Sequence, residues 1–161
     1  MNTPNEVQNR VNIVTYTPAL AVYFRDLNIA WIEKYFKVEE HDSEQLNNPD
    51  EYIMDTGGEI LFAEYDGKIV GTCALIKTAE DEYELAKMAV AENLQGKQIG
   101  KKLGLAAVEW AKRAGAKRLW LESNRILTTA INLYNKLGFV EVPVTYTPYA
   151  RADIRMEIVF R

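Results

Sequence analysis

One segment, residues 95–104, constrains the fold more than any other part of the chain. It lies between an apolar, strand-like segment at 85–90 and a helical segment at 105–114. A strand that runs through a glycine-containing turn into a helix presents several backbone N–H groups and the positive end of the helix dipole at one point. Lys97 and Lys101 add positive charge there. The pattern therefore predicts a binding site for a phosphate or pyrophosphate group.

The segments around this site predict a meander of antiparallel strands followed by a parallel return. Apolar runs at 59–65 and 68–77 are joined by Asp66-Gly67, which is a strong hairpin signal. Residues 83–91 add a third strand, and residues 117–123 follow a helix long enough to bring them back parallel to it. Other strands are expected at 11–16, 139–146 and 152–160, and other helices from Pro18, from Asp42 or Ser43 to Pro49, and from Thr128 or Thr129 to Leu137.

The order of these elements is βααβββαβαββ, without repeats or low-complexity segments. Alternating strands and helices of this kind are typical of an α/β domain. We therefore expect one domain over residues 10–161, with a mixed central sheet flanked by about four helices. Residues 1–9 are polar and are expected to form a flexible N-terminus.

The composition limits the function classes. The 161 residues carry a formal net charge of −4, which makes nucleic acid an unfavourable general partner. Cys73 and His41 are single residues of their kinds, so neither an internal disulfide nor a Cys/His zinc site is expected. No signal-like segment and no apolar run of about 18 residues is present. These features predict a cytoplasmic protein with no metal and no membrane partner.

Two common phosphate-binding motifs do not fit residues 95–104. A Walker-type loop needs four residues between its glycines and a hydroxyl after its lysine, whereas Gly96 and Gly100 are one residue too close and Lys102 replaces the hydroxyl. A dinucleotide fingerprint needs the spacing Gly-x-Gly-x-x-Gly, whereas Gly96, Gly100 and Gly104 are four apart. Spacing by four places small residues on one helical face, so we assign Gly104 to close packing.

Two segments resemble the GNAT superfamily of acetyl-CoA-dependent N-acetyltransferases. Residues 95–103, Gln-Gly-Lys-Gln-Ile-Gly-Lys-Lys-Leu, resemble its Arg/Gln-x-x-Gly-x-Gly/Ala loop. Residues 130–139, Ala-Ile-Asn-Leu-Tyr-Asn-Lys-Leu-Gly-Phe, resemble its Ala-x-x-Leu-Tyr-x-Lys-x-Gly-Phe segment. Both motifs occur in the matching element order, and the resemblance covers about residues 59–139.

The resemblance implies that acetyl-CoA is the cosubstrate. Its pyrophosphate would lie on the backbone amides of the loop, and its pantetheine arm would run along a strand that splays away from the strand at 117–123. The implied cofactor-binding residues are Met88, Ala89, Val90, Gln95, Gly96, Lys97, Gln98, Ile99, Gly100, Lys101 and Asn124. Gln98 stands where the family usually has a glycine, so it must adopt an allowed φ or store about 1–3 kcal/mol of strain.

The connection before residue 130 departs from the family pattern. Many relatives have an Asn two or three residues before the helix Ala, where this chain has Thr128 and Leu127. Asn124 is the nearest Asn and is the candidate for the same contact. Thr128 as a simple helix cap is an alternative reading of this connection.

The resemblance also implies two catalytic residues. Tyr134 matches the family tyrosine near the cofactor sulfur and would donate a proton to the leaving thiolate. Glu84 stands where some members place a catalytic glutamate and would take the amine proton through water. Each has a structural alternative: Tyr134 shares a helical stripe with Ala130 and Leu137, and Glu84 could be one exposed acid among several at a strand start.

The acceptor is expected to be a small-molecule amine, an amino acid or a peptide. The acid-rich segment that includes Glu39 and Glu40 would attract a cationic amine, whereas Arg151 would pair with an acceptor carboxylate. These two ideas predict opposite substrate charges. The late strands offer an edge for a homodimer, and a non-catalytic acyl-CoA-binding or regulatory module is the alternative to an enzyme. The candidate acceptor-site residues are Trp31, Tyr35, Tyr149 and Arg151.

Overall fold

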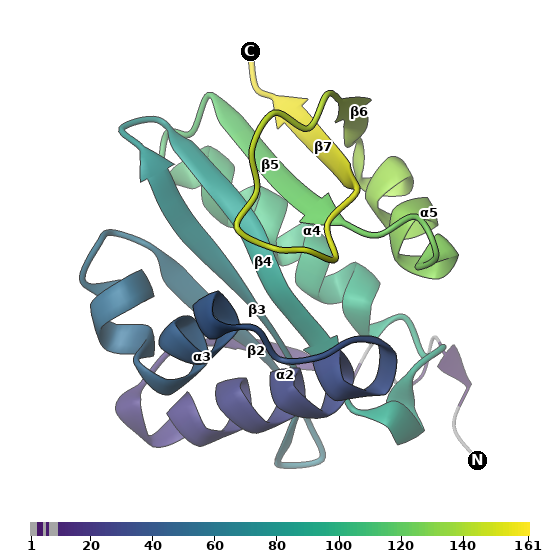
Figure 1. Ribbon diagram of the computed structural model, residues 1–161. Coiled ribbons are helices and arrows are strands. Elements are labelled where there is room, and N and C mark those ends of the chain that lie inside the picture. The colour runs from purple at the N-terminus through teal and green to yellow at the C-terminus, as the bar shows by residue number, and fades with distance from the viewer. Residues whose placement is uncertain (1–2, 5, 7–9) are drawn as a thin grey trace.

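The chain folds around one central sheet that is covered by helices on both faces (Figure 1). The computed structural model describes residues 3–4, 6 and 10–161. Most of the flexible terminus expected at residues 1–9 therefore lies outside the described residues. The described elements are β1 (Asn12–Thr15), η1 (Pro18–Leu20), α2 (Ala21–Tyr35), α3 (Glu40–Asn47), η2 (Asp50–Met54), β2 (Glu59–Tyr65), β3 (Lys68–Ala79), β4 (Glu82–Val90), η3 (Glu92–Leu94), α4 (Ile99–Arg113), β5 (Arg118–Ser123), α5 (Thr128–Leu137), β6 (Val140–Val142) and β7 (Ile154–Val159).

The sheet is mixed, and its strand order is β1-β2-β3-β4-β5-β7-β6. Strands β1 to β4 form an antiparallel meander, and β4 and β5 pair in parallel across α4. Asp66 and Gly67 connect β2 to β3 with φ values of 52° and 73°, the left-handed conformation that a tight hairpin turn requires. The predicted mixed sheet, hairpin and parallel pair are thus confirmed.

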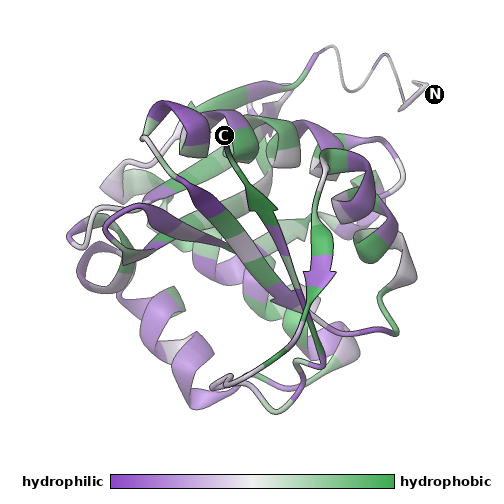
Figure 2. Cartoon of the chain, turned by 90° about the horizontal axis from the view of Figure 1, so that it is seen from above, coloured by the Kyte–Doolittle hydropathy of each residue, from purple (hydrophilic) through white to green (hydrophobic). Residues whose placement is uncertain are grey.

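Two hydrophobic clusters fill the spaces on the two faces of the sheet. One packs α4 and α5 against the sheet around Leu103, Leu119 and Leu121, and the other packs α2 and α3 around Phe24 and Phe62. Figure 2 shows hydrophobic residues concentrated along the central strands and hydrophilic residues on the outer helices. Within the described residues, no helix is long and apolar enough to cross a membrane.

Helix packing explains the glycine at position 104. A Cβ added to Gly104 would lie 2.5 Å from Leu137 Cδ1 of α5, so α4 and α5 approach closely there. The expected packing role of Gly104 is supported, and the neighbour is the helix α5. Ala107 and Ala111 of α4 are buried, whereas Ala114, which directly follows the helix, is exposed.

Two predicted helix caps were wrong. Helix α3 begins at Glu40, because the Glu39 and Asp42 side chains form a capping box with the backbone of the first turn. Asp42 is therefore the third helical residue and not the cap, and Ser43 lies further inside. Helix α5 begins at Thr128 as expected, but Leu127 occupies the cap position and no side-chain cap bond is present.

The late strands are shorter than expected. β6 and β7 are separated by a long connection, residues 143–153, which contains Pro143 and Pro148. Proline cannot donate a ladder hydrogen bond, so the strand expected at 139–146 stops at Val142. In Figure 1 this connection crosses in front of the sheet, on the side that carries α2 and α3.

Candidate active site

Strands β4 and β5 separate after a short parallel contact. Their pairing covers Glu82, Tyr83 and Glu84, which face Arg118, Leu119 and Trp120. β4 then continues to Val90 with only β3 as a ladder partner, while β5 continues to Ser123 beside β7. The two strands diverge visibly in Figure 1. The edge of β4 after Glu84 therefore has backbone groups that can bond an extended ligand.

A β-bulge in β4 lies within this divergence. The register moves from Thr72–Ala89 to Ala74–Ala86, which leaves Lys87 and Met88 opposite Cys73. Lys87 has a φ of 56°, an unusual value for a residue other than glycine. A bulge bends its strand and changes the direction of its side chains. Lys87 consequently reaches α3 on one face, whereas the Met88 sulfur lies near Gly100 on the other.

The phosphate-binding segment predicted at residues 95–104 follows β4 and the short helix η3, and we call its backbone N–H groups the amide cradle. Helix α4 starts at Ile99, and its first backbone bond runs from the Lys102 N–H to the Gln98 carbonyl at 3.2 Å. The N–H groups of residues 99–101 precede that bond and have no partner within the helix. Gly96 has a φ of 81°, which a glycine adopts without strain. These amides and the helix dipole fit a pyrophosphate group.

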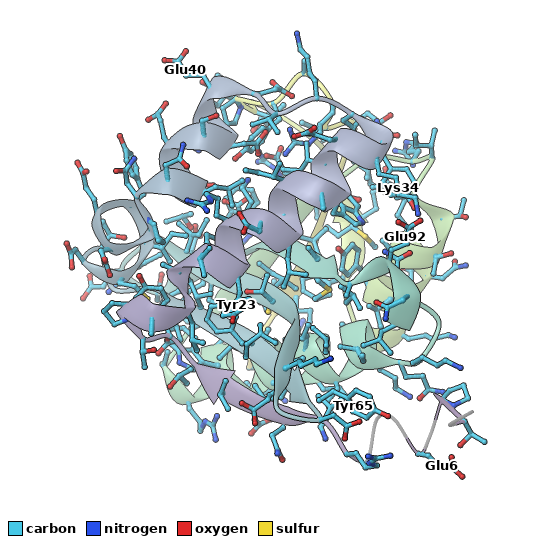
Figure 3. All side chains as sticks on the ribbon, turned by 90° about the horizontal axis from the view of Figure 1, so that it is seen from below. Glu6, Tyr23, Lys34, Glu40, Tyr65 and Glu92 are labelled. Atoms are coloured by element: carbon cyan, nitrogen blue, oxygen red, sulfur yellow. The ribbon has the colours of Figure 1, made fainter. Side chains whose placement is uncertain are left out.

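Contacts on both sides hold the cradle in place. The Gln95 side chain donates from Nε2 to the Val90 carbonyl at 3.3 Å, which ties the turn to the end of β4. Lys34 of α2 forms a 2.9 Å ion pair with Glu92 of η3, and both are labelled in Figure 3. The Ile99 side chain is buried in the core, so a ligand at this turn would meet the backbone N–H of Ile99 and not its side chain.

Gln98 occupies the left-handed region, with φ 65° and ψ 18°. Replacement of Gln98 by Gly should raise the free energy of unfolding by about 1 kcal/mol, because glycine adopts this conformation without a Cβ clash. The melting temperature should then rise by about 2–4 °C. The affinity for CoA, measured by calorimetry, should stay the same because the backbone amides are unchanged.

Gln95 offers a matched control for this prediction. Its φ of −65° is ordinary, so Gln95→Gly should lower stability. A loss of CoA affinity in Gln98→Gly at unchanged or higher stability would contradict the prediction, because it would mean that the Gln98 side chain itself contacts the ligand.

A buried polar network joins three elements on the opposite face of β4. The Asp42 carboxylate accepts two hydrogen bonds of 2.7 Å from Arg151 and lies 2.9 Å from the Lys87 ammonium. Lys87 also donates to the Tyr149 hydroxyl at 2.8 Å, and Arg151 pairs with Glu39 at 3.2 Å. We call these five residues the Asp42 network. It fastens the connection at 143–153 to α3 and to the bulge of β4.

Charge within this network is nearly balanced. Burial alone would raise the pKa of Asp42, but the hydrogen bonds from Arg151, the Lys87 charge and the Glu39 N–H outweigh it and lower the pKa to about 2. Burial lowers the pKa of Lys87, although the Asp42 carboxylate opposes that shift. Asp42 is thus held as an anion at all ordinary pH values.

Glu84 lies beside this network at the point where β4 and β5 separate. Within the described part of the chain, no hydrogen bond or ion pair reaches its carboxylate. Burial raises the pKa of Glu84 to about 7, with Lys87 and Arg155 lowering it and Glu122 raising it. A carboxylate with this pKa exchanges a proton near neutral pH, as a general base requires.

Tyr134 lies on α5, where it packs against the cluster that also contains Cys73. Its ring meets Phe139 edge to face, with centroids 5.9 Å apart. Burial raises the pKa of Tyr134 to about 12, and Cys73 adds to the shift. Burial likewise raises the pKa of Cys73 to about 12, so this thiol stays protonated. Tyr134 therefore keeps its proton and can donate it or hold it in a hydrogen bond.

The other residues that were expected to bind the cofactor or the acceptor lie in different parts of the fold. Asn124 uses both side-chain groups, donating to the Arg151 carbonyl of the connection at 143–153 at 2.7 Å and accepting from the Ile126 N–H of its own loop at 3.0 Å. Trp31 and Tyr35 form an aromatic cluster with their rings 5.4 Å apart on α2. Glu40 is exposed at the start of α3 and points away from the molecule in Figure 3.

The sequence did not identify the three charged residues near Glu84, which are Lys87, Glu122 and Arg155. Arg155 pairs with Glu122 at 3.1 Å across β7 and β5, and Lys87 pairs with Asp42 as described. The Nε atom of Arg155 is buried and has no partner among the described residues. The position of Lys87 between apolar residues of β4 was the one local signal for this group.

Comparison with known proteins agrees with this arrangement. The family model described as "Acetyltransferase (GNAT) family" matches residues 24–139. An uncharacterized N-acetyltransferase of Escherichia coli K12, YjgM, is 30% identical over 147 residues, which cover 86% of each chain. The chain therefore belongs to the GNAT acetyltransferase family, and the expected enzyme class, an acetyltransferase, is confirmed.

Solved structures show the same fold. A GNAT-family acetyltransferase from Staphylococcus aureus Mu50 superposes with a TM-score of 0.83 at 21% identity and covers 94% of this chain and 99% of its own. The protein yncA from Salmonella typhimurium, solved with its cofactor acetyl-CoA, superposes with a TM-score of 0.75 at 18% identity and covers 94% of both chains. The predicted GNAT-like fold is thereby confirmed.

Proposed function

We propose that this chain moves the acetyl group of acetyl-CoA to a primary amine by direct attack, with Glu84 as base and Tyr134 as acid. The proposal rests on three features that lie around the point where β4 and β5 separate. The amide cradle of α4 follows the diverging end of β4, Glu84 lies where the divergence begins, and Tyr134 packs from α5.

The residues of the divergence fit acetyl-CoA. The first-turn amides of α4 would hold the pyrophosphate, with Gly96 and Gln98 supplying the turn, and the open edge of β4 would pair with the amides of the pantetheine arm. When bound, acetyl-CoA supplies an acetyl group activated as a thioester. The proposed contacts come from Met88, Ala89, Val90, Gln95, Gly96, Lys97, Gln98, Ile99, Gly100 and Lys101.

Glu84 and Tyr134 complete the proton balance. Glu84 takes one proton from the acceptor ammonium through a water molecule, so that a neutral amine forms the new C–N bond. The nitrogen loses its second proton to water as the C–S bond breaks, and this proton balances the one that the sulfur receives. Tyr134 donates a hydrogen bond or its proton to the sulfur as the C–S bond breaks. The products are an N-acetylated amine and CoA.

The charges beside Glu84 favour an acceptor that has no carboxylate. Each cation near it is already bonded to an acid: Arg151 to Asp42 and Glu39, and Lys87 to Asp42. Arg155 likewise pairs with a carboxylate, that of Glu122. A second anion brought into this site would have to displace one of these bonds, which is costly in a partly buried site. The Arg151 geometry therefore supports the cationic-amine idea over the acceptor-carboxylate idea.

A pair of matched acceptors tests this proposal. 2-Phenylethylamine and phenylalanine differ by one carboxylate, and we expect kcat/KM to be at least about 10-fold higher for the amine. The assay follows thiol release from acetyl-CoA and identifies the acetylated product by mass, after a broad panel of amines and peptides has been screened. Equal or faster turnover of phenylalanine would contradict the acceptor class. CoA binding without transfer to any amine would contradict the proposed reaction.

The cellular location and the oligomeric state of the protein are predictions. The cytoplasmic location expected from the sequence can be checked by fractionation. The proposed homodimer would use β6, which forms an edge of the sheet and carries an exposed Val140. Sedimentation of the chain over a range of concentrations measures its assembly.

A further inference from the structure

Lys87 is buried in a place where it has two competing acids. Its side chain is 5% exposed, and the ammonium lies 2.9 Å from Asp42 and 2.8 Å from the Tyr149 hydroxyl. Glu84 lies three residues earlier on the same strand and within electrostatic reach of Lys87. The bulge at Lys87 turns the ammonium toward α3, where it forms its ion pair with Asp42.

The surroundings of Asp42 hold its carboxylate in contact with Lys87. It is fully buried and accepts bonds from Arg151, from Lys87 and from the Glu39 N–H at 2.9 Å. Arg151 holds both carboxylate oxygens, which fixes their direction. The Tyr149 hydroxyl donates to Gln45 at 3.3 Å, which leaves its oxygen to accept from Lys87. Both partners of the ammonium are thus held from α3.

The remaining charged groups near Glu84 also have partners, except that the Arg155 Nε atom is buried without one among the described residues. Glu122 of β5 and Arg155 of β7 pair with one another at 3.1 Å, and Glu122 also accepts from Thr147 at 2.9 Å. Tyr149, from the connection over the sheet, is neutral because burial raises its pKa. Lys87 and Arg155 are thus the two cations near Glu84, and Lys87 is the one whose ammonium is held by groups attached to α3.

We propose that Asp42, together with the Tyr149 hydroxyl, is a positioning residue that holds the Lys87 ammonium away from Glu84 and so leaves the Glu84 carboxylate unpaired for proton uptake. The functional meaning of this role rests on the proposed reaction, in which Glu84 is the base. The effect on Glu84 itself is a property of the chain without any substrate, so it can be measured separately from activity.

The test measures the pKa of Glu84 by carboxyl carbon NMR in the ligand-free protein, with the resonance assigned by its loss in Glu84→Gln. In Asp42→Asn, Lys87 loses its anion and turns to Glu84, and the pKa of Glu84 should fall by about one unit. Lys87→Met should raise it, because a neighbouring cation is removed. In the double variant Asp42→Asn/Lys87→Met, the fall should disappear.

Two further variants distinguish the proposed effect on Glu84 from a general loss of structure. Tyr149→Phe removes one contact of Lys87 and should lower the pKa of Glu84 in the same direction by less, even if Asp42→Asn does not fold. Glu39→Gln loosens the hold on Arg151 but keeps the Asp42 contact to Lys87, so it should leave the pKa of Glu84 unchanged. Circular dichroism checks the fold of each variant.

Several results would overturn the proposal. They are a pKa of Glu84 that stays constant or rises in Asp42→Asn and Tyr149→Phe, a fall of equal size without Lys87, or no rise in Lys87→Met. In the active enzyme, the acid limb of the kcat/KM profile should move to lower pH in Asp42→Asn by the shift that NMR measures. If Glu84→Gln instead keeps full activity, the base role fails while the NMR result still decides the role of Asp42.

Discussion

Replacement of Glu84 by Gln is expected to lower kcat/KM for an accepted amine about 10²–10³-fold near neutral pH. Glutamine keeps the size of the side chain but cannot take up a proton. The rate should be measured by thiol release at saturating acetyl-CoA over a range of amine concentrations. Acetyl-CoA affinity should change little, because Glu84 lies at the start of the strand divergence and not in the amide cradle.

The direction in which kcat/KM changes with pH follows from the ionisation of Glu84. Glu84 acts as a base in its ionised form, and burial raises its pKa to about 7, so kcat/KM should increase as the pH rises through about 7. This limb should be absent in Glu84→Gln. In Glu84→Gln the residual rate should instead rise as the pH approaches the pKa of the acceptor amine, because no base takes the ammonium proton in that variant.

Stability gives a second readout that needs no acceptor. A carboxyl group with a raised pKa in the folded state contributes stability at pH values below its unfolded pKa and loses it as the pH rises through about 7. Glu84→Gln should therefore melt at a higher temperature than the natural protein at about pH 8, with a smaller difference at about pH 5. Loss of activity with gain of stability is typical of a functional site.

Glu80 offers a matched control on the turn that precedes β4. It is exposed and lies outside the site, so Glu80→Gln should keep the activity, the limb near pH 7 and the melting temperature. Full activity with an unaltered pH profile in Glu84→Gln would remove Glu84 from the mechanism.

Local sequence patterns predicted the features that depend on residues close together in the chain. The Asp66-Gly67 hairpin follows from the φ values that only a few residues tolerate, and both residues adopt them. The cradle follows from a strand, a glycine turn and a helix that are adjacent in the chain. The parallel return of β5 follows from the length of α4. Each of these features depends on neighbours in sequence.

The surroundings of Glu84 could not be predicted in the same way. Asp42 and Arg151 are 109 residues apart in sequence, and they meet because α3 and the connection at 143–153 fold over the same end of the sheet. The capping-box role of Asp42 gave no indication that its carboxylate would also bind Lys87. The bulge at Lys87 arises from a register shift against β3, which a strand pattern read along β4 alone does not contain.

Replacement of Tyr134 by Phe is expected to lower kcat about 10²-fold, with little change in the KM for acetyl-CoA. The lost hydroxyl stabilises negative charge that develops on sulfur when the C–S bond breaks, so the effect appears in the chemical step. Phe keeps the edge-to-face contact with Phe139, and the folded protein should melt within a few degrees of the natural one. Single-turnover measurements with a saturating amine separate this step from product release.

The pKa of Tyr134 decides which kind of assistance it gives. A phenol of pKa about 12 holds its proton several units more tightly than an ordinary thiol, so a hydrogen bond to the thiolate is favoured over complete proton transfer. Tyr134 should accordingly add no alkaline limb to the kcat profile below about pH 10. Tyr23, which is exposed on α2 and labelled in Figure 3, provides the control, and Tyr23→Phe should leave kcat unchanged. Full kcat in a folded Tyr134→Phe protein would show that the hydroxyl plays no part in thiolate departure.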